Sequence, residues 1–477
     1  MRSSIHSAST RGTGKSSSLG PLGVLAPKLT TAMLAAALTV PLVGTAVAAQ
    51  DNAFDPMRYA GCTVRIAMVA GERDELGLQD LEPDIEAETG INIELTTLEQ
   101  NTLIETIDQN LRADESAYDI MHVIGFSVAG TVGANLFEEL TDYMADPSRV
   151  PADYDFADFP PGVLEYQGYF DVETGEFGGD NLYLIPGIHS GSVLLFYRKD
   201  LLEAAGIEVP TTWTEYLAAA EALTTDDVAG SVMVGANDVS AMLVDWYTRF
   251  ITMGGQLTSG SKAEGTLRVH LDSPEGVAAL QNMIDVLPFS PAGVTQYGFT
   301  EALDAFAVGN VALWPAWSTI AGSLYGEDSL VADTVAVALM PADDGNPRGI
   351  RGGWGLGIPA NLPQEQKDCA FQVLMYITSA DFEKYQVLNY QTDPNRSSTG
   401  ADPVIAEALP FVPLGVATTE SAQILEIANI PETFEIVGAI AREINLALTG
   451  AQDAETAMAA AQAAATAILV RGGHLAE

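Results

Sequence analysis

Basic residues are scarce in this chain, which sets 21 lysines and arginines against 64 aspartates and glutamates, for a formal net charge of −43. The acidic residues are dispersed along the sequence rather than gathered in one tail, which is typical of a solvated acidic surface. Such a surface repels phosphate groups, so nucleic acid and anionic membranes are excluded as partners. The same repulsion disfavours self-association, and we expect a monomer.

Cysteine and histidine are also rare, with two and five residues respectively. No two histidines stand at the spacing of zinc ligands, and the sequence contains neither G-x-S-x-G nor H-E-x-x-H. The GTGKSS stretch at 12–17 lacks both the first glycine and the preceding strand of a phosphate-binding loop. The sequence provides no catalytic motif, and we expect no catalytic residues, no bound metal and no cofactor.

Long apolar runs are confined to residues 29–43 (LTTAMLAAALTVPLV), inside a leader with four basic residues and no acidic one. The small-residue site Ala46-Val47-Ala48 follows, which completes the pattern of a secretory signal peptide over residues 1–48. The run is too short to span a membrane comfortably, and no later run approaches its length. We expect cleavage after Ala48 or Ala49 and a soluble protein, periplasmic or otherwise extracytoplasmic, without membrane insertion. With 17 basic and 64 acidic residues, its charge would be −47.

Strand and helix patterns alternate in the first part of the remaining chain. Residues 62–70 (CTVRIAMVA), 91–99 (INIELTTLE) and 117–125 (AYDIMHVIG) are typical of strands, with helical spacing at 76–90 and 103–115 between them. This alternation indicates an α/β fold with a mostly parallel, doubly wound sheet. A chain of 477 residues is too long for one ordinary core, so two domains or one two-lobed body are expected.

Further along, residues 146–181 are rich in Pro, Asp and Gly, and we expect them to be irregular. The stretch 299–317 predicts a helix, a glycine stop and a strand that ends in VALWPAW. Additional helices are expected at 210–224 behind a threonine cap, at 238–255, 274–287 and 364–379, and through most of the tail after Pro403.

Four segments occur in a familiar order. Residues 180–224 (DNLYLIPGIHSGSVLLFYRKDLLEAAGIEVPTTWTEYLAAAEALT) resemble the signature of bacterial extracellular sugar-binding proteins of the maltose-binding, family 1, type. Arg198 replaces the asparagine usual in that signature. Matching segments follow at 297–322 (YGFTEALDAFAVGNVALWPAWSTIAG), 351–361 (RGGWGLGIPAN) and 393–398 (DPNRSS). The resemblance covers nearly all of the chain after the leader.

This resemblance implies a two-lobed periplasmic-binding-protein fold of type II, in which strands cross a hinge between two α/β lobes. Lobe 1 would hold residues 49–189 and 355–395, and lobe 2 would hold residues 190–354 and 396–477. Cys62 and Cys369 would then belong to one lobe, where either a disulfide or two unpaired buried cysteines is compatible with the sequence.

Three tryptophans are candidates for contact with a ligand. Sugars present apolar C–H faces ringed by hydroxyl groups, so their sites combine aromatic platforms with planar hydrogen-bonding groups. Trp314 and Trp317 lie on opposite faces of a straight strand, although Pro315 would permit a bend that turns both rings inward. Trp354 stands among glycines that let backbone approach a ligand. We favour the cleft over the core for Trp317 and Trp354, keep Trp314 open between the two, and expect Trp213 to pack structurally.

Some of the polar candidates lie in loops that resemble ligand loops of the family, and others, such as Asn395 and Arg396, lie at the third hinge crossing. For each of them the alternative is a surface loop or a hydrogen bond within the hinge. Where family members often carry an aromatic residue and an acid after the third strand, this chain has Phe126 and Ser127, so the ligand class stays open. The polar candidates for ligand binding are Glu72, Arg73, Ser127, His189, Ser190, Asp238, Asn395 and Arg396.

The resemblance implies a non-catalytic receptor that captures a sugar, small oligosaccharide or polyol between its lobes and delivers it to the permease and ATPase of an ABC importer. One rival is an exported carbohydrate-active enzyme, which would need two carboxylates facing each other across the cleft. The other is a receptor for a different solute, such as a polyamine or a glycerol-phosphate ester. The phosphate of such an ester would be bound by cationic groups, for which Arg73, Arg351 and Arg396 are the candidates.

Overall fold

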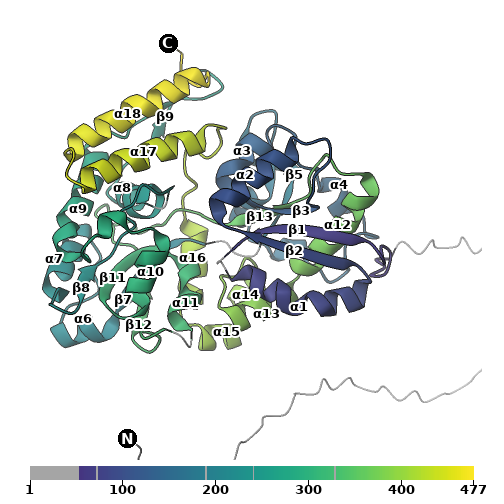
Figure 1. The fold of residues 1–477 in the computed structure, drawn as a ribbon, viewed down its shortest axis with the longest axis horizontal. Coiled ribbons are helices and arrows are strands. Elements are labelled where there is room, and N and C mark those ends of the chain that lie inside the picture. The colour runs from purple at the N-terminus through teal and green to yellow at the C-terminus, as the bar shows by residue number, and fades with distance from the viewer. Residues whose placement is uncertain (1–52, 71–72, 188–190, 240, 327–328, 477) are drawn as a thin grey trace, which may run out of the picture. The chain divides into compact units, whose positions relative to one another are not determined.

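The computed structural model describes residues 53–70, 73–187, 191–239, 241–326 and 329–476, so the predicted signal peptide lies outside the described residues. From Asp51 onward the chain forms one unit. Within this unit the described strands form a five-stranded sheet, a four-stranded sheet and two two-stranded sheets. Figure 1 shows the two larger sheets, each with its own helices, and we call them the first and the second sheet.

The first sheet contains five strands, and it includes the three strands expected near the start of the chain. β1 pairs in parallel with β2 and with β3, which confirms the parallel alternation predicted there. β13 pairs antiparallel with both β3 and β6, so the sheet is mixed. In spatial order the strands are β2 (Asn92–Leu98), β1 (Thr63–Val69), β3 (Ile120–Ile124), β13 (Trp354–Gly357) and β6 (Leu184–Pro186).

Alternating side chains of β1 build a core on each face of this sheet. Ile66 and Met68 point to one face, where α1 (Asp74–Thr89) and α12 (Gln364–Ile377) pack. Ala67 and Val69 point to the other face, against α2 (Gln100–Leu111). Because both faces are covered, the strand is a continuous apolar run rather than an alternating one.

The second sheet has the order β12 (Val335–Ala338), β7 (Val193–Arg198), β11 (Val311–Trp317), β8 (Ala229–Ser231). β7 pairs antiparallel with β12 and β11, whereas β8 pairs in parallel with β11. Helices on this side include α7 (Trp213–Leu223), which begins at the predicted threonine cap, since the Thr212 hydroxyl accepts from the Glu215 N–H. The neighbouring pair α17 (Thr433–Leu448) and α18 (Ala454–Arg471) lies side by side, drawn yellow in Figure 1.

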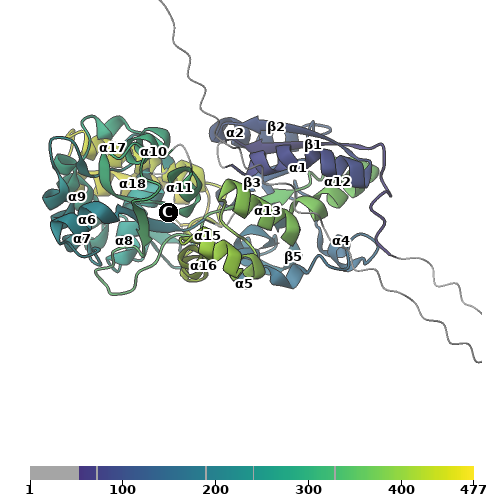
Figure 2. The same ribbon diagram turned by 90° about the horizontal axis from the view of Figure 1, so that it is seen from below.

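The other elements are short or peripheral. Figure 2 shows α13 (Ala380–Tyr390), α15 (Pro403–Ala408) and α16 (Val412–Ser421), which belong to the later part of the chain. The remaining helices and strands are α3 (Val128–Thr131), α4 (Thr141–Ala145), α5 (Pro161–Gln167), α6 (Lys199–Ala205), α8 (Thr248–Thr252), α9 (Pro274–Val286), α10 (Phe299–Ala307), α11 (Ala321–Tyr325), α14 (Ser397–Gly400), β4 (Tyr169–Asp171), β5 (Glu176–Leu182), β9 (Thr258–Ser259) and β10 (Arg268–Val269).

Two predictions of local structure were wrong in part. Residues 146–181 were expected to be irregular, but they contain α5, which starts at Pro161, and the β4–β5 hairpin. Proline is well tolerated at the first position of a helix, so it begins α5 instead of preventing it. The helix expected at 238–255 is a π-helix over Ala241–Tyr247 followed by α8.

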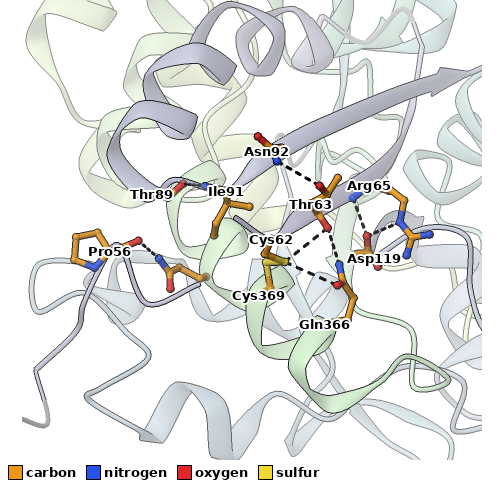
Figure 3. Close-up of a disulfide and its surroundings, with 11 residues drawn as sticks. Pro56, Cys62, Thr63, Arg65, Thr89, Ile91, Asn92, Asp119, Gln366 and Cys369 are labelled. Atoms are coloured by element: carbon orange, nitrogen blue, oxygen red, sulfur yellow. Dashed lines mark hydrogen bonds and ion pairs between the residues drawn. A yellow bond between two sulfur atoms is a disulfide. The ribbon is translucent and has the colours of Figure 1, made fainter. Parts of the chain in front are cut away.

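Cys62 and Cys369 form a disulfide that joins the chain just before β1 to α12, across a sequence separation of 307 residues (Figure 3). Beside it, the Gln366 side chain donates to the Thr63 carbonyl at 2.7 Å. Both ends of the link belong to elements that pack on the first sheet. The disulfide therefore ties the start of β1 to a helix that comes about 300 residues later in the chain and packs on the same sheet.

Three segments connect the two sheets, and hydrogen bonds hold them to one another. The Gly187 N–H donates to the Trp354 carbonyl at 2.8 Å, and the Asn395 side-chain amide donates to the Gly187 carbonyl. The Ser318 hydroxyl donates to Asp393 at 2.6 Å. Residues near 187, 352 and 394 therefore form one connected hinge.

Candidate functional site

A pocket at this hinge gathers side chains from both sheets and from the connecting segments. From the first sheet and its helices come residues that include Phe126 and Tyr166, and from the second come residues that include Leu243 and Trp317. The cavity has a volume of about 60 Å³. Its lining residues are Gln100, Ile124, Phe126, Tyr166, Gly191, Val239, Leu243, Trp317, Thr319, Gly352, Gly353 and Trp354.

Two of the three candidate tryptophans line this pocket together. Trp317 is the last residue of β11, and its ring lies so close to Gly352 that a Cβ atom there would stand 2.7 Å from Cζ3. Trp354 begins β13, and its ring packs on His122 with centroids 4.9 Å apart. Gly353, which directly precedes Trp354, has φ 110°, a conformation that favours glycine.

Trp314 does not belong to the pocket, which corrects its inclusion among the ligand candidates. It is 1% exposed and packs against Phe299 and Phe306, with ring centroids 5.9 and 6.1 Å away. Pairing between β11 and β7 continues without a shift through Pro315, so the strand does not bend. Side-chain alternation then sends Trp314 into the core on the face opposite Trp317.

The loop after β3 contributes the aromatic side chain of Phe126 to the pocket, whereas Ser127, the polar residue that we expected there, does not line it. Phe126 lines the pocket and meets Tyr166 edge to face at 6.5 Å. The Ser127 hydroxyl donates to the Ile124 carbonyl at 2.8 Å, and the residue lines a separate cavity toward Pro431 and Phe434. Ser127 is therefore a local turn residue, because its hydroxyl closes the 3₁₀ turn.

Tyr166 is a pocket residue that the sequence did not reveal. It comes from α5, inside the segment expected to be irregular, and is 1% exposed. Among the described residues its hydroxyl has no hydrogen-bond partner. Burial raises the pKa of Tyr166, which keeps the hydroxyl protonated and able to donate. Gln100 and Leu243 were also missed, since nothing local distinguishes either from an ordinary helical residue.

Arg73, Asn395 and Arg396 hold structure rather than line the pocket. Arg73 donates from Nε to the Tyr390 carbonyl at 2.7 Å. Arg396 is 1% exposed, lies 4.1 Å above the Phe159 ring and donates to the Thr378 carbonyl. Asn395 is buried and bound to Gly187. For these three residues the alternative to ligand binding was a structural role at the surface or in the hinge, and their contacts favour the structural role.

Of the remaining polar candidates, one is next to a pocket residue in sequence and three lie outside the described residues. Asp238 does not line the pocket, whereas the adjacent Val239 does. Glu72, His189 and Ser190 lie outside the described residues. Trp213 packs structurally as expected, because its Nε1 donates to Thr252 at 2.8 Å and Arg249 stacks on its ring at 4.4 Å.

A buried carboxyl group connects α13 to the third hinge segment. Glu383 accepts from the backbone N–H groups of Asn395 and Arg396, both at 3.0 Å. Burial raises the pKa of Glu383 to about 7, although the hydrogen bond from Arg396 opposes the shift. The protonated form of Glu383 is therefore favoured by the folded protein.

This raised pKa makes the stability contributed by Glu383 dependent on pH. Because the folded state holds the proton more tightly than the unfolded state, the contribution is complete below about pH 4 and is lost as pH rises through about 7. We expect the unfolding free energy of the native protein, minus that of Glu383→Gln, to fall by about 3 kcal/mol between pH 4 and pH 8. Urea unfolding at a series of pH values measures this difference, in which Asp245, whose pKa is also raised to about 7, cancels. A difference that does not change with pH would contradict the expectation.

No helix in the described part of the chain is both long and apolar enough to cross a lipid bilayer.

The sequence matches the family model described as bacterial extracellular solute-binding protein over residues 76–384. The mannitol-binding protein of Pseudomonas aeruginosa is 25% identical over 451 residues, which cover 88% of this chain and 96% of that protein. A solved ABC transporter solute-binding protein from Agrobacterium radiobacter K84, in complex with ribitol, superimposes with a TM-score of 0.76 at 24% identity, over 86% of this chain and 99% of that one.

A second solved solute-binding protein, from Agrobacterium vitis S4 with bound D-mannitol, gives a TM-score of 0.72 at 25% identity, over 86% of this chain and 98% of that chain. These neighbours confirm the two-lobed periplasmic-binding-protein fold. Since the family match spans well over half of the sequence, this chain belongs to the bacterial extracellular solute-binding proteins.

Proposed function

We propose that this protein is the extracytoplasmic receptor of an ABC importer and that it binds a monosaccharide or a polyol in the pocket between Trp317 and Trp354. The observation that carries the proposal is the chemistry of this pocket. It combines two indole rings, which suit C–H faces, with the Tyr166 hydroxyl, which has no hydrogen-bond partner among the described residues and suits a ligand hydroxyl. The ligands of the mannitol- and ribitol-binding relatives support this class.

The position of the pocket supports a mechanism of capture. Phe126 and Tyr166 come from the side of the first sheet, whereas Trp317 comes from the second. A ligand that contacts both sides binds the closed arrangement more tightly than an open one, so it shifts the protein toward closure. The closed form would then dock on the permease. The sheet memberships support lobe boundaries at 49–189 with 355–395 and at 190–354 with 396–477.

Export and the lack of catalysis belong to the same proposal. The leader pattern over residues 1–48 and the family to which the chain belongs support a location outside the cytoplasm. The pocket lining contains no Asp or Glu side chain among the described residues. This composition favours a receptor over a glycosidase, which would need two carboxylates there.

Calorimetric titration of the mature protein tests the ligand class. The panel should contain ribitol, mannitol, a monosaccharide such as glucose, maltotriose and putrescine. Tight one-to-one binding of a polyol or monosaccharide is expected, with no conversion of the ligand on prolonged incubation. Preferential binding of maltotriose would shift the proposal to oligosaccharides. Preferential binding of putrescine, or release of a product, would refute it.

Tyr166→Phe tests the hydroxyl contact. Removing one hydrogen bond to the ligand is expected to weaken binding roughly 10-fold. Because the hydroxyl has no partner in the described part of the protein, the unfolding free energy should stay within about 0.5 kcal/mol of the native value. Titration of both proteins with the ligand identified by the panel measures the effect. Unchanged affinity would remove Tyr166 from the site.

A further inference from the structure

A second cavity, of about 160 Å³, lies at the hinge and shares no lining residue with the proposed ligand pocket. We name it the hinge cavity. It is open to the surface near Pro161 and Ser397, which are exposed. Its lining residues are Pro160, Pro161, Gly162, Val163, Arg351, Pro394, Asn395, Arg396, Ser397, Val416 and Thr419.

The charge of the hinge cavity is opposite to that of the protein as a whole. In a chain with a net charge of −43, the lining of this cavity contains two arginines and no carboxylate. Arg396 is already engaged by the Thr378 and Asp155 carbonyls and lies 3.7 Å from Asp158. Asp158 thus balances the charge of Arg396, whereas Arg351 forms no ion pair with a carboxylate of any described residue, so Arg351 is the cationic group whose charge is still uncompensated.

Arg351 is 6% exposed and forms no ion pair with any described residue. Its Nη2 atom donates to the Thr419 carbonyl at 3.1 Å and its Nη1 atom donates to the Gly162 carbonyl, but its Nε has no partner among the described residues. Burial lowers the pKa of Arg351, whereas Glu165 acts on it only at longer range. A buried guanidinium held by neutral carbonyls gains from an anion that accepts from Nε.

Asn395 supplies the complementary group. It is 1% exposed, and its side-chain nitrogen donates to Gly187, which leaves Oδ1 as an acceptor without a partner in the described part of the chain. An acceptor of this kind matches a hydroxyl donor rather than a second carboxylate oxygen. Between the two polar groups, Pro160, Val163, Pro394 and Val416 provide apolar walls.

We propose that the hinge cavity binds a small hydroxycarboxylate with a short alkyl chain. Its carboxylate accepts from Arg351, its hydroxyl donates to Asn395 and its alkyl carbons contact the proline and valine side chains. This ligand differs in charge from the polyol or sugar of the main pocket. The proposal does not depend on the identity of the ligand in that pocket.

Titration calorimetry with sodium 3-hydroxybutyrate and with sodium lactate, each against sodium chloride at matched ionic strength, tests the proposal. Saturable one-to-one binding of at least one of them is expected. Butyrate, which lacks the hydroxyl, should bind roughly 10-fold more weakly, and neutral butane-1,3-diol should bind weakest of all. Absence of saturable binding for both acids, or binding of butane-1,3-diol as tight as that of the better acid, would overturn the proposal.

Substitutions locate the binding in the hinge cavity. Val416→Phe fills the cavity and should abolish hydroxycarboxylate binding, whereas the matched control Val404→Phe alters a valine that is 57% exposed on α15 and should not. Arg351→Gln should also abolish it, and if that variant does not fold, Val416→Phe alone decides. Retention of binding in folded Val416→Phe would place the acid elsewhere and refute the proposal.

Discussion

Replacing Trp317 with alanine is expected to weaken ligand binding roughly 30- to 100-fold, because a large aromatic contact at the centre of a site commonly contributes 2 kcal/mol or more. The ring closes the pocket from the end of β11 and packs against Gly352. Its loss removes both the stacking surface and one wall of the cavity. Titration of the mature variant with the ligand of the native protein measures the effect.

Trp314→Phe is the matched control for this substitution. Trp314 lies three residues away on the same strand, but it is buried against α10, and among the described residues its indole Nε1 has no hydrogen-bond partner. Phenylalanine therefore removes no hydrogen bond and leaves the pocket intact. Ligand affinity should stay within about 2-fold of the native value. Equal losses for Trp314→Phe and Trp317→Ala would mean that the strand, and not the pocket wall, is responsible.

The second large effect is expected from the disulfide. The double substitution Cys62→Ser, Cys369→Ser should lower the free energy of unfolding by about 3–5 kcal/mol, because the link spans 307 residues and restricts the unfolded chain strongly. Urea unfolding followed by circular dichroism, with the native protein in parallel, measures the loss.

A measurement of ligand affinity distinguishes this loss of stability from damage to the ligand pocket. Neither cysteine lines the pocket, so the double variant should bind its ligand with native affinity under conditions where it remains folded. Single substitutions to serine should be as destabilising as the pair, since either one removes the link. A double variant as stable as the native protein would show that the packing of α12 alone holds this region.

Much of the framework could be predicted from periodicity. Strands such as β1 and β2 stood out because they are short β-rich runs bounded by turn residues, and the order of motifs placed Trp317 and Trp354 beside a hinge. Simple side-chain alternation already favoured opposite faces for Trp314 and Trp317. The structure shows that Pro315 does not alter it, because β8 pairs only with Val311 and Leu313 and leaves that edge of β11 free at the proline.

The polar part of the site could not be predicted in the same way. Arg73 lies in a loop that resembles a ligand loop of the family, and Asn395 and Arg396 lie at the third hinge crossing. Their partners, however, include backbone carbonyls far away in sequence. Tyr166 sits on a seven-residue helix too short to leave a periodic pattern. In each case the role of the side chain depends on tertiary neighbours, which local sequence does not encode.

The pairing of β13 has a consequence for the order in which the two larger sheets can form as the chain is synthesised. Since β3 and β6 are both paired by β13, each exposes a free edge until residues 354–357 have emerged. By then the strands of the second sheet, the last of which ends at Ala338, have all been synthesised. All strands of the second sheet are therefore present before the first sheet can be finished. Until β13 pairs with them, β3 and β6 have unpaired edges that can pair with strands of another chain. A net charge of −43 makes partly folded copies of the chain repel one another, which opposes this pairing.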